Sequence, residues 1–419
     1  MNFYRYLIIL LAISTIKTKA NTLATDSINS WGWSLNLMKS KVLSMDKYQK
    51  LWMKYSKNGS VELEVIHNTL PKDSDCFAYD FNYPTLSLGL RYTINNYVKL
   101  HRSPNEAWGK AKEVDYDSKL GNTFSSYITF RRAIHRSNHW KTEYSLSAGI
   151  GINSLWYNKT NNIDNELIGS PLLIYFGTGI HQSYQFADNW AIRGGIEFVH
   201  HSNGALARPN KGSNSLGTSI GIVYQPYTTK KLIYNKKAIE KKTFKKYCYF
   251  NTSIGIGAKT LLEEWQLTQF HTEPSEPNYR TGKFKLYLAY SMQFDFMYRY
   301  ARRWASGIGF DYFYGSYFSQ IKQMDNLAGY NIKHSPISLG IALKHEVFYH
   351  NLSLSMGIGG YIYRYMGKYI TDNEPRYYER IGVNYSFQKL GNIKIGIIVK
   401  AHYTKADLTE LVISYPIKL

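Results

Sequence analysis

A histidine and a serine two positions apart, His200 and Ser202, are the residues best suited to chemistry in this sequence. They end a segment in which every second residue from Ile192 onward is apolar or glycine. Side chains two positions apart on a β-strand point to the same face, so the imidazole and the hydroxyl would lie side by side. Such a pair can supply a nucleophile and its general base. Two polar residues marking the end of a membrane strand remain the alternative interpretation.

A third polar residue is expected beside this pair. Leu216, Ile220 and Ile222 define the apolar face of the next segment, and counting back by twos places Asn214 on that face. Because a short loop joins the two segments, Asn214 would lie at the same end as His200. It could orient the imidazole as the third member of a triad.

The same spacing argues against a metal centre. His200 and His201 are adjacent, so they point to opposite faces of a strand and cannot chelate one ion together. The two cysteines, Cys76 and Cys248, are remote in sequence, and whether they form a disulfide stays open. Hydrolysis through Ser202 would need no metal and no other cofactor.

These residues belong to a chain that alternates apolar and polar residues along most of its length. The alternating runs reach about ten to fifteen residues, longer than typical soluble strands of about five or six and close to the roughly 9–11 that a tilted membrane strand needs. We therefore predict an all-β fold, an antiparallel transmembrane β-barrel with about 16 strands in total. The predicted strands are residues 31–39, 60–69, 85–97, 123–135, 140–154, 168–185, 189–203, 213–226, 247–259, 281–298, 302–317, 331–346, 349–366, 376–389, 391–403 and 407–419.

The composition and the N-terminal segment favour an outer-membrane location. The net charge is +21, and 38 of the 419 residues are tyrosine, which disfavours a disordered or coiled-coil chain. Residues 1–20 are predicted to be a cleaved secretory signal peptide, with Arg5 before an apolar stretch and Ala20 at its end. The apolar stretch is too short for a helical anchor, which needs roughly 20 residues. We expect the outer membrane of a Gram-negative bacterium, reached through the barrel-assembly machinery.

A lysine-rich connection, residues 227–246, divides the predicted strands into two sets of eight. Such a run is typical of a solvated linker or of a surface that touches phosphates, and no nucleic-acid-binding module accompanies it, so nucleic acid is not expected as a partner. This connection and residues 70–84 are both long where the alternation of long loops and short turns calls for a short periplasmic turn. Whether the strands close into one barrel or two stays open.

The residues around the His-Ser pair carry a family resemblance. The run Phe-Val-His-His-Ser-Asn-Gly at 198–204, followed by Arg208, Pro209, Asn210 and Gly212, resembles the signature of the lipid A 3-O-deacylase family. It is more similar still to the longer acyloxyacyl hydrolase-like members from the Bacteroidetes. The resemblance implies an eight-stranded outer-membrane barrel with a lipid-facing serine hydrolase site.

The resemblance also implies how the chain is divided. It covers roughly residues 31–226, and the second half is similar only to the extra segment of the longer members. We therefore expect a deacylase-like barrel half that carries the site at 21–226, the Lys-rich connection at 227–246, and a second barrel half at 247–419.

The roles of the residues follow from the same resemblance. It implies that His200 is the general base and Ser202 the nucleophile. Asn210 and the backbone N–H groups of Asn203 and Gly204 would form an oxyanion hole.

One position departs from the family pattern. Where the family carries a glutamate as the third triad member, this chain has Asn214, which can orient His200 but cannot neutralise the imidazolium that forms during attack. Glu197 cannot replace it, because its parity directs it into the lumen. We expect weak activity for this reason.

The resulting functional hypothesis is an outer-membrane serine esterase, a carboxylic ester hydrolase that removes an ester-linked acyl chain from lipid A or a similar glycolipid. Lipopolysaccharide or a phospholipid would be the substrate. The alternative is a catalytically silent barrel that acts as a pore or a structural protein. The inward row of the strand that carries His200 is rich in ionisable residues, such as Arg193, Glu197 and His201. Such a row is equally compatible with a filled barrel and with a water-filled channel.

Overall fold

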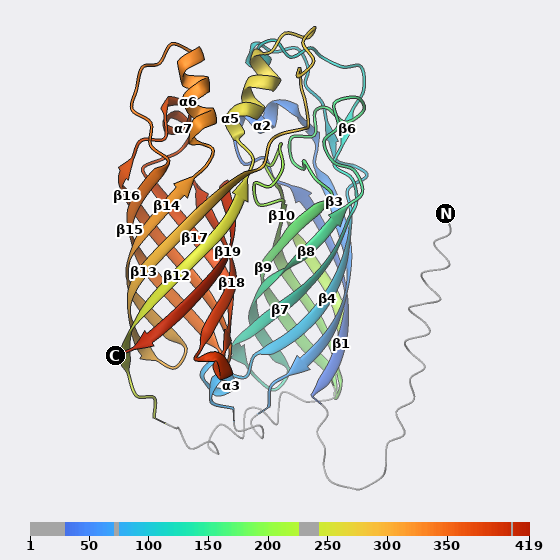
Figure 1. Cartoon of the computed structure of the whole chain (residues 1–419). Helices are drawn as coiled ribbons and strands as arrows, with labels where there is room; N and C mark the ends of the chain where they lie inside the picture. Colours follow the sequence, from blue (N-terminus) through green and yellow to red (C-terminus); the bar gives the residue numbers. More distant parts are fainter. Residues whose placement is uncertain (1–29, 71–74, 226–242, 404) are drawn as a thin grey trace.

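The computed structural model describes residues 30–70, 75–225, 243–403 and 405–419, and these form two closed antiparallel β-barrels of eight strands each (Figure 1). The predicted all-β fold with sixteen barrel strands is confirmed, and of the two closures left open by the sequence the pair of eight-stranded barrels is correct. The predicted signal peptide and most of the Lys-rich connection lie outside the described residues.

The first barrel closes between its first and last strands. Trp33 of β1 pairs with Tyr224 of β11 on one side and with Val65 of β3 on the other. Each strand therefore has a partner along both edges, which satisfies the backbone groups that an open sheet would expose to lipid. The strands are β1 (Trp31–Val42), β3 (Lys57–Asn68), β4 (Thr85–Ile94), β7 (Thr123–Arg136), β8 (Trp140–Asn153), β9 (Leu172–Ala187), β10 (Trp190–Ser202) and β11 (Ser213–Tyr224).

The second barrel closes in the same way, because its first strand pairs with both its second and its last. Ile254 lies opposite Met292 of β13 and opposite Ile413 of β19. The strands are β12 (Tyr247–Lys259), β13 (Tyr287–Ala301), β14 (Trp304–Gly315), β15 (Ile337–Tyr349), β16 (Leu352–Arg364), β17 (Tyr377–Phe387), β18 (Ile393–His402) and β19 (Lys405–Lys418).

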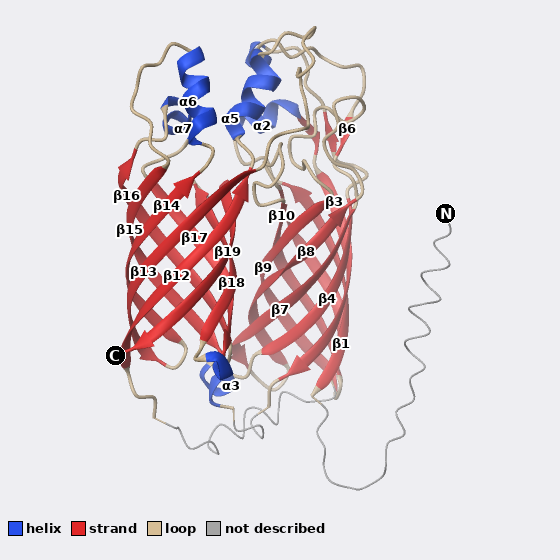
Figure 2. Cartoon of the chain, in the orientation of Figure 1, coloured by secondary structure: helices blue, strands red, loops and turns tan. Residues whose placement is uncertain are grey.

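The connections contain short elements that the alternation did not predict. Most gather at one end of the barrels, whereas α3 lies at the opposite end, in the long connection between β3 and β4 (Figure 2). None of the helices in the described ranges is both long and apolar enough to cross a membrane. The additional elements are α2 (Lys47–Trp52), β2 (Met53–Tyr55), α3 (Cys76–Asp80), β5 (Lys99–Leu100), η3 (Glu106–Trp108), β6 (Ser118–Lys119), α5 (Leu262–Gln266), η5 (Leu267–His271), α6 (Phe318–Leu327), α7 (Lys368–Asn373) and η6 (Gln388–Leu390).

Three predicted strands begin too early. The segments expected to start at 168, 281 and 331 start at Leu172, Tyr287 and Ile337. The residues before them belong to the long loops; Ile168 packs in an apolar cluster of these loops, whereas Leu286 and Ile332 are exposed. Cys76 and Cys248 are both free thiols.

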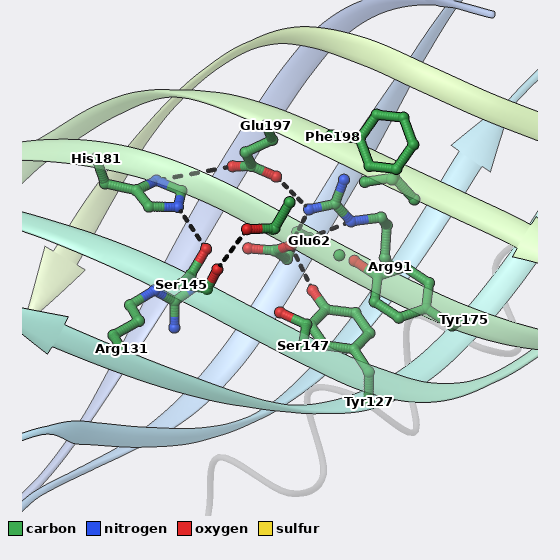
Figure 3. A pocket seen from close by; sticks show the side chains of 13 residues that line it. Glu62, Arg91, Tyr127, Arg131, Ser145, Ser147, Tyr175, His181, Glu197 and Phe198 are labelled. Carbon is green, nitrogen blue, oxygen red and sulfur yellow. Dashed lines mark hydrogen bonds and ion pairs between the residues drawn. The ribbon is translucent and has the colours of Figure 1, made fainter. Parts of the chain in front are cut away.

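The lumen of the first barrel is filled by charged and aromatic side chains (Figure 3). Arg91 bonds to Glu62 and lies 2.6 Å from a carboxylate oxygen of Glu197, and Tyr127 stacks on Tyr175 with ring centroids 4.4 Å apart. The cavity among them measures about 10 Å³, room for about one water molecule. At this level the barrel interior is a packed polar core, which disfavours an open channel through the first barrel.

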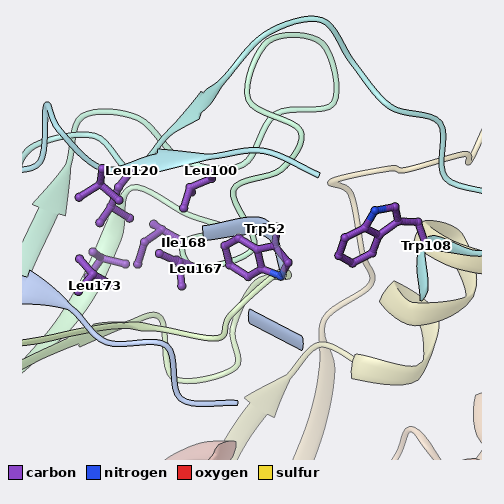
Figure 4. Packing of buried hydrophobic residues seen from close by; sticks show 9 residues of the cluster. Trp52, Leu100, Trp108, Leu120, Leu167, Ile168 and Leu173 are labelled. Atoms are coloured by element: carbon purple, nitrogen blue, oxygen red, sulfur yellow. The ribbon is translucent and has the colours of Figure 1, made fainter. Parts of the chain in front are cut away.

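The two barrels contact each other at both ends. At the end with most of the helices, an apolar cluster in the loops of the first barrel includes Trp52 and Trp108, and Phe270 of the second barrel packs against it (Figure 4). At the other end, Tyr349 of the second barrel packs against Phe81 and Phe130 of the first. These contacts fix the position of one barrel against the other.

Candidate active site

The structure brings together the three residues that the sequence predicted as a triad. His200 of β10 lies directly opposite Asn214 of β11 on the ladder. The His200 Nδ1 atom lies 2.7 Å from Asn214 Oδ1, and its Nε2 atom lies 2.9 Å from Ser202 Oγ. The three side chains form one continuous hydrogen-bonded chain.

This hydrogen-bonded chain defines the tautomer of His200. Because Asn214 presents its carbonyl oxygen, the Nδ1 atom of His200 is the one that carries a proton and donates. The Nε2 atom is then free to accept the hydroxyl proton of Ser202. This is the arrangement that a general base needs next to a serine nucleophile.

The predicted alternation of β10 is confirmed by burial. Ile192 and Ile196 are exposed on the outer surface, and Glu197 and His201 are buried in the lumen. His201 Nε2 lies 2.9 Å from Ser125 Oγ of β7. His200 and Ser202 therefore share the outward face with the apolar residues of their strand.

The three residues are more buried than their outward parity alone implies. The outward parity suggested that His200 and Ser202 protrude at the membrane rim, but Ser202 is only 6% exposed and Asn214 only 7%. The loop between β10 and β11 turns back against the strand end. A Cβ atom on Gly212 would lie 2.8 Å from Cε1 of His200, so the backbone there packs directly on the imidazole.

The loop that follows Ser202 determines which donors could face an oxyanion. The backbone N–H of Asn203 donates to Asn210 Oδ1 at 3.0 Å, so this N–H is no longer free. The bond fixes the Asn210 side chain beside the nucleophile and leaves its NH₂ group as a donor. The Gly204 N–H makes no hydrogen bond within the described part of the chain. Gly204 and Asn210 thus remain as donors, whereas Asn203 serves to hold Asn210.

The distal part of the same loop is anchored to the first barrel. The N–H of Lys211 donates to the carbonyl of Glu166 at 3.1 Å, and the N–H of Gly212 donates to that of Leu167 at 3.0 Å. Gly212 has φ of +75°, a conformation that favours glycine. The loop between β8 and β9 therefore supports the residues that pack on His200.

A buried polar cluster that was not predicted from the sequence supports the loop between β8 and β9. Arg102 and Tyr48 both donate to the carboxylate of Glu166, and Arg280 of the second barrel lies 2.8 Å from Asp164. Burial raises the pKa of Tyr48 to about 12, so its hydroxyl stays protonated and donates. These residues lie in the connections between barrel strands, outside the two-residue alternation.

A cluster of possible metal ligands lies in the second barrel. Within the residues that the structure describes, Glu374, His402 and Asp407 bring their ligand atoms within 4.8 Å of one another. Their carboxylates already bind cationic side chains, because Lys400 Nζ lies 2.7 Å from Asp407 and Arg364 pairs with Glu374. The cluster is a set of ion pairs inside the barrel, and we propose no metal for it.

Each of the two barrels matches the model of a known protein family. Residues 82–223 match the model for lipid A 3-O-deacylase (PagL), and residues 248–419 match the model for the C-terminal domain of acyloxyacyl hydrolase. One match falls on each barrel, and together they cover more than half of the chain. The chain belongs to the lipid A 3-O-deacylase and acyloxyacyl hydrolase family. It is therefore an outer-membrane β-barrel of the lipid A deacylase type, from a family of acyl hydrolases. No curated protein matches it.

Solved outer-membrane structures show distant likeness. The crystal structure of the outer membrane enzyme PagL is 12% identical, and the alignment covers 46% of this chain and 99% of that one, with a TM-score of 0.25. The FrpB iron transporter from Neisseria meningitidis is 9% identical over 93% of this chain and 81% of its own, with a TM-score of 0.21. A porin variant from Rh. blastica is 8% identical over 92% and 99%, with a TM-score of 0.16. The family assignment rests on the two family models and not on these structures.

Proposed function

We propose that this protein is a serine esterase of the outer membrane that removes an ester-linked acyl chain from lipid A or a similar glycolipid. The observation that carries the proposal is the hydrogen-bonded chain from Ser202 through His200 to Asn214 on the outer surface of a family barrel. The substrate need not leave the membrane to reach the nucleophile, because both would meet at the edge of the bilayer.

In the proposed reaction, Ser202 Oγ attacks the carbonyl carbon of the ester while its proton passes to Nε2 of His200. The oxyanion accepts hydrogen bonds from the Gly204 N–H and the Asn210 side-chain NH₂. When the intermediate collapses, the bond from the carbonyl carbon to the sugar oxygen breaks, and His200 returns the proton to that oxygen, which leaves as a hydroxyl. Water then attacks the acyl-serine, again with His200 as base, and releases the fatty acid.

The surface beside the site suits an acyl chain. On β9, Phe176 lies opposite His200 and Ile174 lies opposite Ser202 on the ladder, and both side chains are half-buried on the outer face. Phe198 continues this apolar surface on β10. An acyl chain in the outer leaflet would pack on these residues with its ester near Ser202.

The packing of the first barrel disfavours one of the two passive roles, that of a pore. At the level of the Arg91–Glu62 and Arg91–Glu197 ion pairs its lumen leaves a cavity of about 10 Å³, so an open pore through the first barrel is disfavoured. The alternative that remains is a structural barrel with an inactive site.

Mass spectrometry of lipid A can separate these alternatives. Cells that express the wild-type chain should lose one acyl chain from lipid A, and cells that express Ser202→Ala should not. His201→Ala is the matched control, because the neighbouring histidine points into the lumen and bonds to Ser125. Phospholipids from the same cells report whether they are the substrate instead. Identical lipid profiles for the wild type and Ser202→Ala would leave only the structural role.

A further inference from the structure

The second barrel contacts the loop of the first barrel that follows Ser202. Thr409 of β19 donates its hydroxyl to the carbonyl oxygen of Gly204 at 2.8 Å. Thr260, just after β12, donates both its N–H at 2.8 Å and its hydroxyl at 2.9 Å to the carbonyl oxygen of Ala205. The residues two and three positions after the proposed nucleophile are thus hydrogen-bonded to the other barrel.

The contact is reciprocal, because the same loop also donates to the second barrel. Arg208 donates through two nitrogens to the carbonyl oxygen of Thr260, at 3.2 and 2.9 Å. Arg208 is 7% exposed and Thr260 is 2% exposed. These bonds are therefore shielded from water. Inside the protein, away from water, a hydrogen bond is stronger and its loss costs more.

One residue at the contact, Ala205, adopts a backbone conformation that needs support. Gly204 has φ of +63° and Ala205 has φ of +71°. The second is unfavourable for a residue with a Cβ atom and persists only where surrounding contacts hold it. Thr260 supplies such contacts to Ala205. A Cβ on Gly204 would overlap Oγ1 of Thr409, so the second barrel lies directly against this residue.

Thr409 itself occupies an unexpected position. It belongs to the outward row of β19, whose following members Leu411, Ile413 and Tyr415 are about half exposed, while Glu410 points inward and pairs with Arg380. A hydroxyl on an apolar, lipid-facing row is costly unless it has a partner. Its partner is Gly204, whose N–H is a donor in the proposed oxyanion hole.

We infer that the second barrel is a positioning element of the hydrolase site, and that Thr409 and Thr260 are positioning residues that set the orientation of the Gly204 amide. This inference rests on the proposed esterase function. It explains how one loop can be fixed at both ends: Gly204, Ala205 and Arg208 bind the second barrel, and Lys211 and Gly212 bind the first.

The test is the steady-state kinetics of lipid A deacylation by the purified full-length chain. Thr409→Val keeps the shape of the side chain and removes its hydroxyl, so kcat should fall about tenfold with little change in KM, because only the oxyanion contact is displaced. Thr409→Ser keeps the hydroxyl and should restore most of the rate. Thr260→Val combined with Thr409→Val should lower kcat further.

The matched control is Thr371→Val. Thr371 of α7 donates its hydroxyl to the carbonyl oxygen of Gly367 at 2.7 Å, so it makes the same kind of bond within the second half of the chain. All variants should retain the faster gel migration of an unheated barrel. A kcat for Thr409→Val equal to the wild type, or equal losses for Thr409→Val and Thr409→Ser, would overturn the inference even if Ser202→Ala is inactive. Absence of activity in the wild type would overturn the proposed function together with the inference.

Discussion

The carbonyl oxygen of the Asn214 side chain lies 2.7 Å from Nδ1 of His200, where a triad would place a carboxylate oxygen. Asn214 thus fixes the imidazole in the tautomer that a general base requires. It carries no charge, so it would not stabilise the imidazolium that the proposed reaction forms when Ser202 loses its proton. Asn214 therefore orients the imidazole of His200 but does not compensate its positive charge.

Asn214→Asp should therefore raise the deacylation rate. The two side chains have the same length, so the carboxylate oxygen would take the place of Oδ1 and add the missing charge. In serine proteases the corresponding exchange changes kcat by about 10⁴, and we expect an increase of about tenfold or more here. Single-turnover kinetics with lipid A would measure it.

Asn214→Ala and Asn214→Glu are the comparison variants for this prediction. Alanine removes the partner of Nδ1 and should lower the rate. Glutamate, one methylene longer, should give a smaller increase than aspartate, because the space at 214 is set for the shorter side chain. Equal rates for Asn214→Asp, Asn214→Ala and the wild type would exclude residue 214 from the mechanism.

Sequence periodicity was enough to place the sixteen barrel strands approximately and to bring the three candidate site residues together. The alternation of β10 is local, so burial of Glu197 and exposure of Ile196 follow from the order of residues alone. Counting by twos along β11 placed Asn214 on the outward face, and the ladder then set it opposite His200. These inferences needed only the two-residue period of a strand and a short connecting loop.

The closure of the barrels and the support of the site could not be predicted in this way. Whether β11 pairs with β1 or with β12 depends on contacts between segments far apart in sequence. The bond from Thr409 to Gly204 joins residues from different barrels, and the loop from 203 to 212 has no periodicity. The one local signal was a threonine in the lipid-facing row of β19.

Gly212→Ala should impair catalysis by displacing His200. The new methyl group would lie 2.8 Å from Cε1 of the imidazole, and the backbone φ of +75° adds strain for any residue with a Cβ. We expect kcat to fall by about tenfold or more, because small displacements of a catalytic base are costly.

Gly329→Ala separates these two effects. Gly329 has a similar φ of +80°, and a Cβ there would have no atom within 4 Å. This variant should carry the backbone strain alone and keep normal activity. If both glycine variants had wild-type kcat, the packing of Gly212 on His200 would be irrelevant to the reaction.

Glu64→Ala should destabilise the first barrel. Glu64 is fully buried and binds Arg193 at 2.6 Å and Arg131 at 2.7 Å, so its removal leaves two guanidinium groups in the lumen without their shared counter-ion. Breaking a buried ion pair from one side costs about 3–5 kcal/mol. The variant should convert from the fast-migrating folded band to the unfolded band at a lower temperature.

Asp117→Ala is the control for the loss of an ion pair. Asp117 pairs with Lys99 at 2.9 Å, and both side chains are about half exposed. An exposed pair contributes at most about 1 kcal/mol, so this variant should unfold close to the wild-type temperature. An equal effect of both substitutions would mean that the lumen ion pairs do not dominate barrel stability.

The local stability of α5 should fall as the pH rises. Burial raises the pKa of Glu263 to about 7, with Lys259 opposing and Glu374 reinforcing the shift. The unfolded carboxyl titrates near 4.3, so between these values the folded state holds the proton and the unfolded state does not. The stability from this group is fully present below about pH 4 and is lost as the pH rises towards 7.

Hydrogen exchange of residues 262–271 at pH 5.5 and pH 8, each corrected for the intrinsic exchange rate, would measure this change. Protection should fall on the order of tenfold between the two values. Glu263→Gln removes the ionisation and should give equal protection at both, whereas Glu276→Gln, an exposed residue of the same connection, should keep the wild-type difference. Because Arg208 lies close enough to Glu263 for each charge to shift the other's pKa, ionised Glu263 should also strengthen the attraction to this loop. A wild-type chain whose protection of α5 increased at pH 8 would show that this attraction outweighs the cost of burying the charge.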